Sequence, residues 1–240
     1  MQQRLPSLLD KPITFAHRGA RAHAPENTIE AFALALRLGS SGLESDVWLT
    51  ADGHPVLDHD GLIRRRLGRS ARIADLLRHE LPPHIPTLDD LLAECGSGYH
   101  LSLDIKDPRA GQRVVDVVRS ADPGLLDRLW LCSPERDVLR PLRGSGARLV
   151  DSTRLARIKE GPERRAAALA ADGIDAINLH HTDWNGGLVA LFHRFDRIAF
   201  GWDLQAPHLL EDALRMGLDG VFSDYPDRMA DAFRAQIGAL

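Results

Sequence analysis

The sequence predicts an α/β fold, a closed (β/α)8 barrel of the TIM-barrel type with a short insertion after the second strand. Short apolar runs of strand length alternate with helical patterns along nearly all of the 240 residues. Eight strand–helix units recur about every 30 residues, which is the size of a βα unit. Repeated βα units imply parallel strands with right-handed crossovers, and eight of them at this length fit a closed barrel.

The first strand and helix set the pattern. The apolar run at residues 13–17 predicts a strand, and residues 27–38 place their apolar side chains on one helical face. Asn27 at the start of this helix, with Glu30 three residues later, is typical of a capping box, and Gly39 ends the helix.

The remaining units repeat this pattern in order. We expect strands at residues 42–49, 99–106, 128–132, 148–151, 174–179, 197–202 and 220–223. Helices are expected at residues 87–95, 111–120, 133–142, 162–171, 187–195, 207–216 and 226–236. An open doubly wound sheet is the alternative, but no GxGxxG motif follows the first strand.

A long segment at residues 60–86 interrupts this rhythm, after a short extended piece at 55–57. It carries six arginines: Arg64, Arg65, Arg66, Arg69, Arg72 and Arg78. We expect an insertion over the barrel mouth, either a solvated basic loop with a short helix or a contact surface for an anionic substrate or polyanion. No linker is visible elsewhere, so residues 1–240 are expected to form one domain.

Composition and charge exclude several classes of protein. Apolar residues make up 44% and charged residues 27%, which is a globular balance. A net charge of −4 gives no bulk reason to expect nucleic acid as a partner. We expect no membrane span and no signal peptide, and therefore a cytoplasmic protein. Cys95 and Cys132 are too few for a disulfide framework, and nothing indicates the oligomeric state.

Three carboxylates lie on strands that should be neighbours in the barrel. Glu44 and Asp46 are two residues apart, so they share one face of the second strand, and Asp104 lies on the third. Such groups repel one another unless a positive charge lies between them. Their oxygens suit Mg²⁺ or Ca²⁺ rather than structural zinc, and Arg18 and Lys106 add positive charge beside them. Read singly, Glu44 and Asp46 could be a solvated edge, and Asp104 with Lys106 a simple ion pair.

Two histidines also fall at the carboxyl ends of strand segments, where barrel enzymes carry their chemistry. His17 ends the first strand, and His59 follows the extended piece. Beside a cation and a phosphate ester they could act as general base and general acid, although a histidine at a strand end can also be structural. The other nine histidines are interpreted as structural or surface residues, with a reservation for residues 178–181 at the mouth.

A set of motifs resembles the glycerophosphodiester phosphodiesterase family. They are residues 16–19 (AHRG), 25–28 (PENT), 44–47 (ESDV), 50–53 (TADG), 59–60 (HD), 85–88 (IPTL), 103–106 (LDIK) and 217–226 (GLDGVFSDYP). The resemblance covers nearly the whole chain, but residues 112–195 carry little of it. It implies a TIM barrel that hydrolyses glycerophosphodiesters, with a divalent cation, to glycerol 3-phosphate and an alcohol.

The resemblance also implies a role for each site residue. The implied acid–base pair is His17 and His59, the metal ligands are Glu44, Asp46 and Asp104, the phosphate-binding residues are Arg18 and Lys106, and the pocket-lining residue is Trp202. Glu26 would reach the glycerol hydroxyls or brace Arg18. The cation would be Mg²⁺ or Ca²⁺, with Mn²⁺ also possible.

The chain departs from the family pattern at two positions. Asp104 stands where the family has Glu, which affects the metal geometry. Asp203 follows Trp202 where the family has Thr, so a further carboxylate either lies near the pocket or faces away. The expected partner is a small-molecule phosphodiester. A lysophospholipase D acting on lysolipids, or a catalytically silent phosphodiester-binding barrel, are the alternatives.

Overall fold

The computed structural model describes residues 4–64 and 70–238. Its parallel strands are β1 (Ile13–Ala16), β2 (Gly42–Leu49), β6 (His100–Ile105), β7 (Leu129–Ser133), β8 (Arg148–Ser152), β9 (Ala176–His180), β10 (Ile198–Trp202) and β11 (Gly220–Ser223). Its α-helices are α1 (Ile29–Arg37), α2 (Leu88–Cys95), α3 (Ala110–Ala121), α4 (Arg136–Leu139), α5 (Pro162–Asp172), α6 (Gly186–His193), α7 (Pro207–Arg215) and α8 (Pro226–Ile237).

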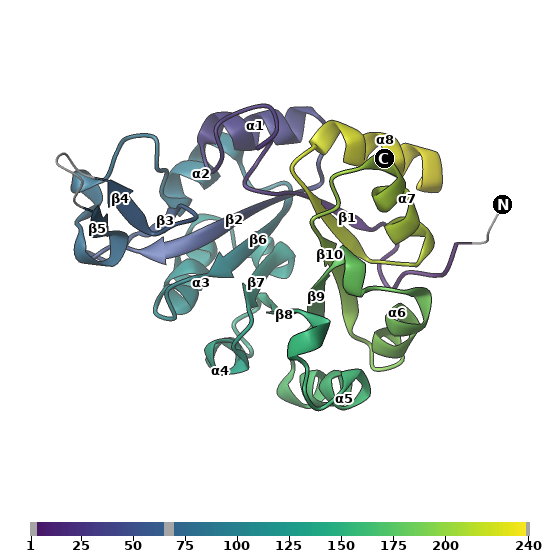
Figure 1. Cartoon of the computed structure of the whole chain (residues 1–240). Coiled ribbons are helices and arrows are strands. Elements are labelled where there is room, and N and C mark those ends of the chain that lie inside the picture. The colour runs from purple at the N-terminus through teal and green to yellow at the C-terminus, as the bar shows by residue number, and fades with distance from the viewer. Residues whose placement is uncertain (1–3, 65–69, 239–240) are drawn as a thin grey trace.

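The strands confirm the predicted closed barrel. Within the described ranges, eight parallel strands form a ring in the order β1–β2–β6–β7–β8–β9–β10–β11, and β11 pairs again with β1. Figure 1 shows the helices around the outside of this ring. The register places Asp46 of β2 level with Asp104 of β6, and Trp202 of β10 level with His180 of β9. Polar residues of neighbouring strands therefore meet at the carboxyl ends.

Aromatic rings fill the inside of the barrel beneath that end. Phe15 and Phe222 stack with ring centroids 4.5 Å apart, and Trp130 meets Phe200 edge-on at 4.9 Å. Gly220 makes room for this layer, because a Cβ at that position would lie 2.7 Å from the ring of Phe200. The interior is a packed core rather than a pore, so ligands have access only from the end of the barrel.

The start of α1 differs from the prediction. Thr28, not Asn27, is the N-cap, and its hydroxyl oxygen accepts the backbone N–H of Ala31 at 3.2 Å. Asn27 adopts a left-handed backbone with φ of 55°, and its side-chain oxygen accepts the Ser45 hydroxyl at 2.7 Å. This buried bond to β2 takes the Asn27 side chain away from the helix end.

The helix predicted over residues 133–142 is also shorter than expected. The segment contains α4 and then a 3-10 turn at Arg140–Leu142. Pro141 explains the break, because proline has no N–H to donate to the helical hydrogen-bond ladder.

The insertion contains a β-hairpin in addition to the short helical turns that were expected. The strand β3 (Pro55–Leu57) pairs antiparallel with β2 outside the ring, and β4 (Leu62–Arg64) pairs antiparallel with β5 (Ser70–Arg72). Two 3-10 turns, Ile73–Asp75 and Arg78–Glu80, complete the segment. Figure 1 shows it beside the end of β2, and its apolar side chains form a small core of their own. Three of the six arginines, Arg65, Arg66 and Arg69, lie outside the described residues.

Two further expectations concern the chain as a whole. No helix in the described part of the chain is long and apolar enough to cross a membrane. Cys95 and Cys132 are both free thiols, as expected.

Candidate active site

A cavity of about 620 Å³ opens at the carboxyl end of the barrel. Eight of the nine predicted site residues line it: His17, Arg18, Glu44, Asp46, His59, Asp104, Lys106 and Trp202. The remaining lining residues are Arg21, Pro134, Ser152, Thr153, Arg154, Arg157, Asn178, Asp203, Gln205, Phe222 and Asp224. Residues far apart in the sequence therefore meet in one place because the strands that carry them are neighbours.

The three predicted metal ligands form one cluster. Glu44, Asp46 and Asp104 each bring a carboxylate oxygen within 4.8 Å of the others. Glu44 and Asp46 are only 5% and 3% exposed, and Asp46 Oδ2 is buried without a hydrogen bond. Oxygen-only ligands of this kind suit a hard divalent cation, and Asp46 Oδ2, which accepts no hydrogen bond, could serve as one of its ligands. The shorter side chain of Asp104 still reaches the cluster because its strand position is level with Asp46.

Two cations flank this cluster. Lys106 Nζ lies 2.9 Å from Asp46 Oδ1 and 3.2 Å from Asp104 Oδ2. Burial acts to lower the pKa of Lys106, but the two aspartates outweigh it, so the pKa lies above its usual value and the ammonium keeps its charge. Arg18 Nε lies 3.5 Å from Asp46 Oδ2, and the Arg18 backbone N–H donates to Glu44 Oε2 at 2.9 Å. Both side chains line the cavity beside the carboxylates.

Glu44 shows how much negative charge is concentrated here. Burial, together with the nearby Asp46 and Asp104 carboxylates, raises the pKa of Glu44 to about 7, although His17 acts to lower it. Without a cation the site therefore tends to retain a proton. A divalent ion would stabilise the ionised form, so the charge balance also fits such an ion.

His17 is held by a residue whose role the motifs did not predict. Its Nδ1 lies 2.6 Å from Asp224 Oδ1, and its Nε2 lies 3.9 Å from Glu44 Oε2. Burial acts to lower the pKa of His17, but Glu44 and Asp224 outweigh it, and the pKa lies above its usual value. The contact with Asp224 at Nδ1 fixes the orientation of the His17 ring and leaves Nε2 on the side of Glu44. Its place at the end of the last strand was the available signal.

His59 reaches the cavity from the segment after β3. Its Nδ1 lies 2.7 Å from the carboxylate of the neighbouring Asp60, and its side chain is 42% exposed. The two histidines therefore differ in support, because His17 is anchored by a residue that follows the neighbouring strand β11, whereas His59 is anchored within its own loop.

Glu26 lies behind the arginines instead of lining the cavity. It accepts from Arg18 at 3.1 Å and lies 2.5 Å from Arg21 Nε. Of the two expectations for Glu26, the structure therefore shows the contact that braces Arg18.

The rim beyond Trp202 contains residues that sequence reasoning missed. Arg154 lies over the Trp202 ring at 5.6 Å from its centroid, and Arg157 lines the same side of the cavity. Asp203 has a left-handed backbone with φ of 66°, and its side chain lines the cavity rather than facing away. The two arginines lie in the stretch that carried little motif, so no pattern singled them out.

Solved structures share this fold. The chain matches a glycerophosphodiester phosphodiesterase from Thermotoga maritima with a TM-score of 0.80 and 22% identity, over 93% of this chain and 99% of the other. It matches an Oleispira antarctica phosphodiesterase, solved in complex with the product sn-glycerol-3-phosphate, with a TM-score of 0.78 and 21% identity. That match covers 92% of this chain and 96% of the other.

Sequence comparisons give the family. A glycerophosphodiester phosphodiesterase of Bacillus altitudinis is 24% identical over 89% of this chain and 95% of its own length. A mouse protein, glycerophosphodiester phosphodiesterase 1, is 38% identical over 36% of this chain, and the match spans only 31% of the mouse protein. Residues 17–228 match the glycerophosphoryl diester phosphodiesterase family, which covers most of the barrel. The chain therefore belongs to the glycerophosphoryl diester phosphodiesterase family.

Proposed function

We propose that this protein hydrolyses glycerophosphodiesters to glycerol 3-phosphate and an alcohol. The observation that carries the proposal is the meeting of three carboxylates, two cations and two histidines in one cavity. Membership of the family supports the same activity.

The carboxylate cluster is the proposed site of a divalent cation, Mg²⁺, Ca²⁺ or Mn²⁺. Glu44, Asp46 and Asp104 would hold it, and the buried Asp46 oxygen without a hydrogen bond supports this assignment. When bound, such an ion neutralises phosphate charge and polarises the bonds to phosphorus.

Arg18 and Lys106 would bind the phosphate oxygens from beside the cluster. Both line the cavity, and both are already held in place by carboxylates. A planar guanidinium binds two oxygens of a phosphate at once, whereas an ammonium acts as a point charge. Trp202 would provide an apolar wall for the part of the diester beyond the phosphate.

His17 and His59 would carry the protons. One histidine takes the proton of the glycerol 2-hydroxyl as its oxygen bonds to phosphorus. The other gives a proton to the alcohol oxygen as the old P–O bond breaks. Water then opens the cyclic phosphate, with the proton transfers reversed, to yield glycerol 3-phosphate.

A lysolipid substrate is a second candidate, and one observation favours it. Leu62 and Leu77 of the insertion are 52% and 40% exposed, which would suit contact with an apolar tail or surface. The cavity itself is lined mainly by charged and polar side chains, which favours a water-soluble diester.

A substrate panel separates these candidates. Bound metal would first be removed with a chelator, and Mg²⁺, Mn²⁺ or Ca²⁺ would then be added. The protein would be assayed with glycerophosphocholine, glycerophosphoethanolamine, glycerophosphoinositol and a lysophospholipid. Release of glycerol 3-phosphate from the first three supports the proposal, whereas preferential cleavage of the lysolipid supports lysophospholipase D activity. Binding without turnover of any of them would indicate a silent barrel and contradict both.

A further inference from the structure

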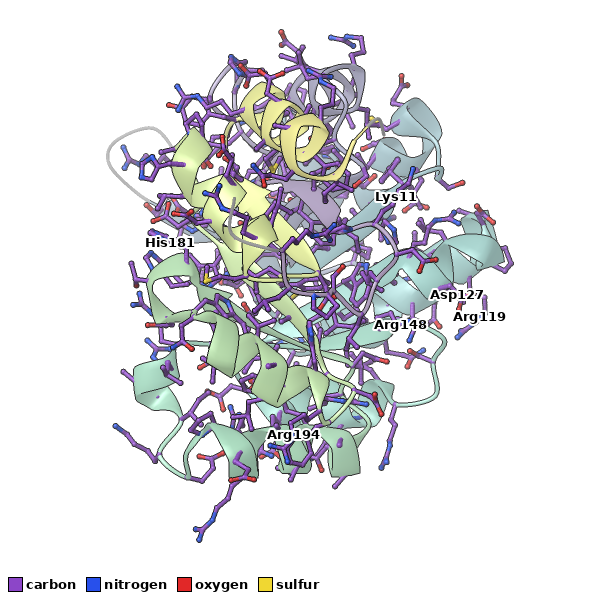
Figure 2. All side chains as sticks on the ribbon, turned by 90° about the vertical axis from the view of Figure 1, so that its right-hand side faces the viewer. Lys11, Arg119, Asp127, Arg148, His181 and Arg194 are labelled. Atoms are coloured by element: carbon purple, nitrogen blue, oxygen red, sulfur yellow. The ribbon has the colours of Figure 1, made fainter. Side chains whose placement is uncertain are left out.

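A second group of metal-ligating side chains lies at the carboxyl end of the barrel, apart from the carboxylate cluster. His180, His181 and Asp203 each bring one ligand atom within 4.8 Å of the others. His180 ends β9 beside Trp202 of β10, and Asp203 is the next residue after Trp202, so the two strands bring the group together. Figure 2 shows His181 at the end of the barrel opposite to Lys11 and Arg148.

Two of these side chains are already oriented toward each other. His180 Nε2 lies 3.1 Å from Asp203 Oδ2. Two ligands of a tetrahedral zinc ion lie about 3.3 Å apart when each is about 2.0–2.1 Å from the metal. The observed separation is therefore close to the spacing that such an ion requires, and only a small displacement would admit it.

The other polar atoms of the His180 and Asp203 side chains are also held by hydrogen bonds. His180 Nδ1 lies 2.7 Å from the Thr182 hydroxyl, and Asp203 Oδ1 accepts from Gln205 Nε2 at 3.1 Å. Metal sites commonly fix their imidazole and carboxylate ligands through such outer hydrogen bonds. A ligand pair supported in this way is built more like a metal site than like an ion pair between free surface side chains.

We propose that His180, His181 and Asp203 bind a transition-metal ion of the Zn²⁺ class at the rim of the cavity. Two imidazoles and one carboxylate suit Zn²⁺ and not Mg²⁺ or Ca²⁺, which prefer oxygen ligands. With three protein ligands the ion keeps a further position for water or another small ligand. The proposal uses no residue of the carboxylate cluster, so it holds or fails independently of the proposed function.

Another histidine–aspartate pair provides a matched control. His23 Nε2 lies 3.0 Å from Asp227 Oδ1, nearly the same separation as in the rim pair. Within the described residues, this pair belongs to no three-ligand group. If a single histidine–aspartate pair were enough to bind zinc, the His23 site would bind it as well.

The test is zinc binding by the folded, chelator-stripped protein, measured in competition with a chromophoric chelator in excess Mg²⁺. The wild-type protein is expected to bind one more zinc equivalent than His181→Gln and Asp203→Asn. If a variant still binds this additional zinc ion, its affinity should be more than about tenfold lower than that of the wild type. Even the substitution of a residue that only supports a metal ligand lowers metal affinity by about that factor. His23→Gln should bind zinc as the wild type does.

Thermal unfolding checks that the variants fail to bind rather than fail to fold. Zinc should raise the Tm of the wild-type protein, because an ion that binds only the folded state stabilises it. The metal-free variants should unfold cooperatively and show a smaller rise. Equal zinc stoichiometry and affinity in the wild type, His181→Gln and Asp203→Asn would overturn the proposal. An equal loss in His23→Gln would overturn it as well.

Discussion

His17 and His59 line the same cavity but are supported differently. His17 is anchored by Asp224, which follows the neighbouring strand β11, and His59 is anchored by the adjacent residue Asp60. We expect His17→Ala and His59→Ala each to lower kcat by roughly 10²- to 10⁴-fold, the usual contribution of a general acid or base. Steady-state turnover of glycerophosphocholine would measure this.

The Asp224 contact gives this prediction a control. Asp224→Asn keeps the shape of the partner but removes its charge, so it should lower kcat in the same direction through the orientation of His17. Circular dichroism of all three variants should match the wild type. Near-normal turnover in His17→Ala or His59→Ala would remove that histidine from the proposed pair.

Asp104 is the carboxylate that departs from the family pattern. Its proposed role as a metal ligand can be tested by measuring activity as a function of metal concentration. We expect Asp104→Asn to raise the metal concentration needed for half-maximal activity, with turnover partly restored by added metal, because the variant has lost one negative charge beside the ion. Asp104→Glu should be tolerated better than Asp104→Ala. An unchanged titration in Asp104→Ala would leave Asp104 as only the partner of Lys106, to which it lies at 3.2 Å.

The elements show which parts of the site could be predicted. Alternation along β2 was enough to place Glu44 and Asp46 on one face, since side chains two apart on a strand share a side, and the expected pairing of neighbouring strands added Asp104. The partner of His17 was not predictable in this way, because Asp224 is 207 residues away and only barrel closure brings the two together. The rim residue Arg154 was missed because its strand end carries no recognisable motif, and for the same reason His180 received only a reservation as part of residues 178–181.

Local signals were also least reliable at the ends of helices. Asn27 and Thr28 are both good N-cap residues, and sequence alone does not decide between them. The decision came from a tertiary contact, because the buried Ser45 hydroxyl engages Asn27 and leaves Thr28 as the cap. The fold class survived such errors because it depends on the repetition of eight units.

The N-cap of α1 gives a prediction at this scale. Thr28→Ala removes the side-chain acceptor for the Ala31 N–H and should lower the free energy of unfolding by about 1 kcal/mol. Urea denaturation should show a lower midpoint at an unchanged m-value. A midpoint equal to that of the wild type would mean that Thr28 does not cap the helix.

The whole molecule should lose stability in mild acid through a histidine at the other end of the barrel. Burial, with a smaller effect of Arg128, lowers the pKa of His100 to about 4. The neutral ring lies 3.2 Å from the Trp130 indole N–H, which donates to its Nδ1. Between about pH 6.5 and pH 4, His100 is protonated in the unfolded chain but stays neutral in the folded protein. The free energy of unfolding should therefore fall across that interval.

A substitution isolates this contribution. In His100→Gln the fall in the free energy of unfolding between pH 6.5 and 4 should be smaller than in the wild type, as measured by urea denaturation at each pH. The exposed His208 provides the comparison, and His208→Gln should leave the fall unchanged. An equal fall in the wild type and His100→Gln would assign the acid sensitivity to other groups.

The contact between His17 and Asp224 also has a consequence for the order in which a growing chain becomes active. The carboxylate cluster comes from β2 and β6, which are adjacent in the ring and can pair early. Asp224 follows β11, the last strand to be synthesised, and contacts of such long sequence separation form late. A nascent chain can thus assemble its anionic cluster while His17 still lacks its partner. Proton transfer is then the last capability that the barrel acquires, and it arrives only with closure of the ring.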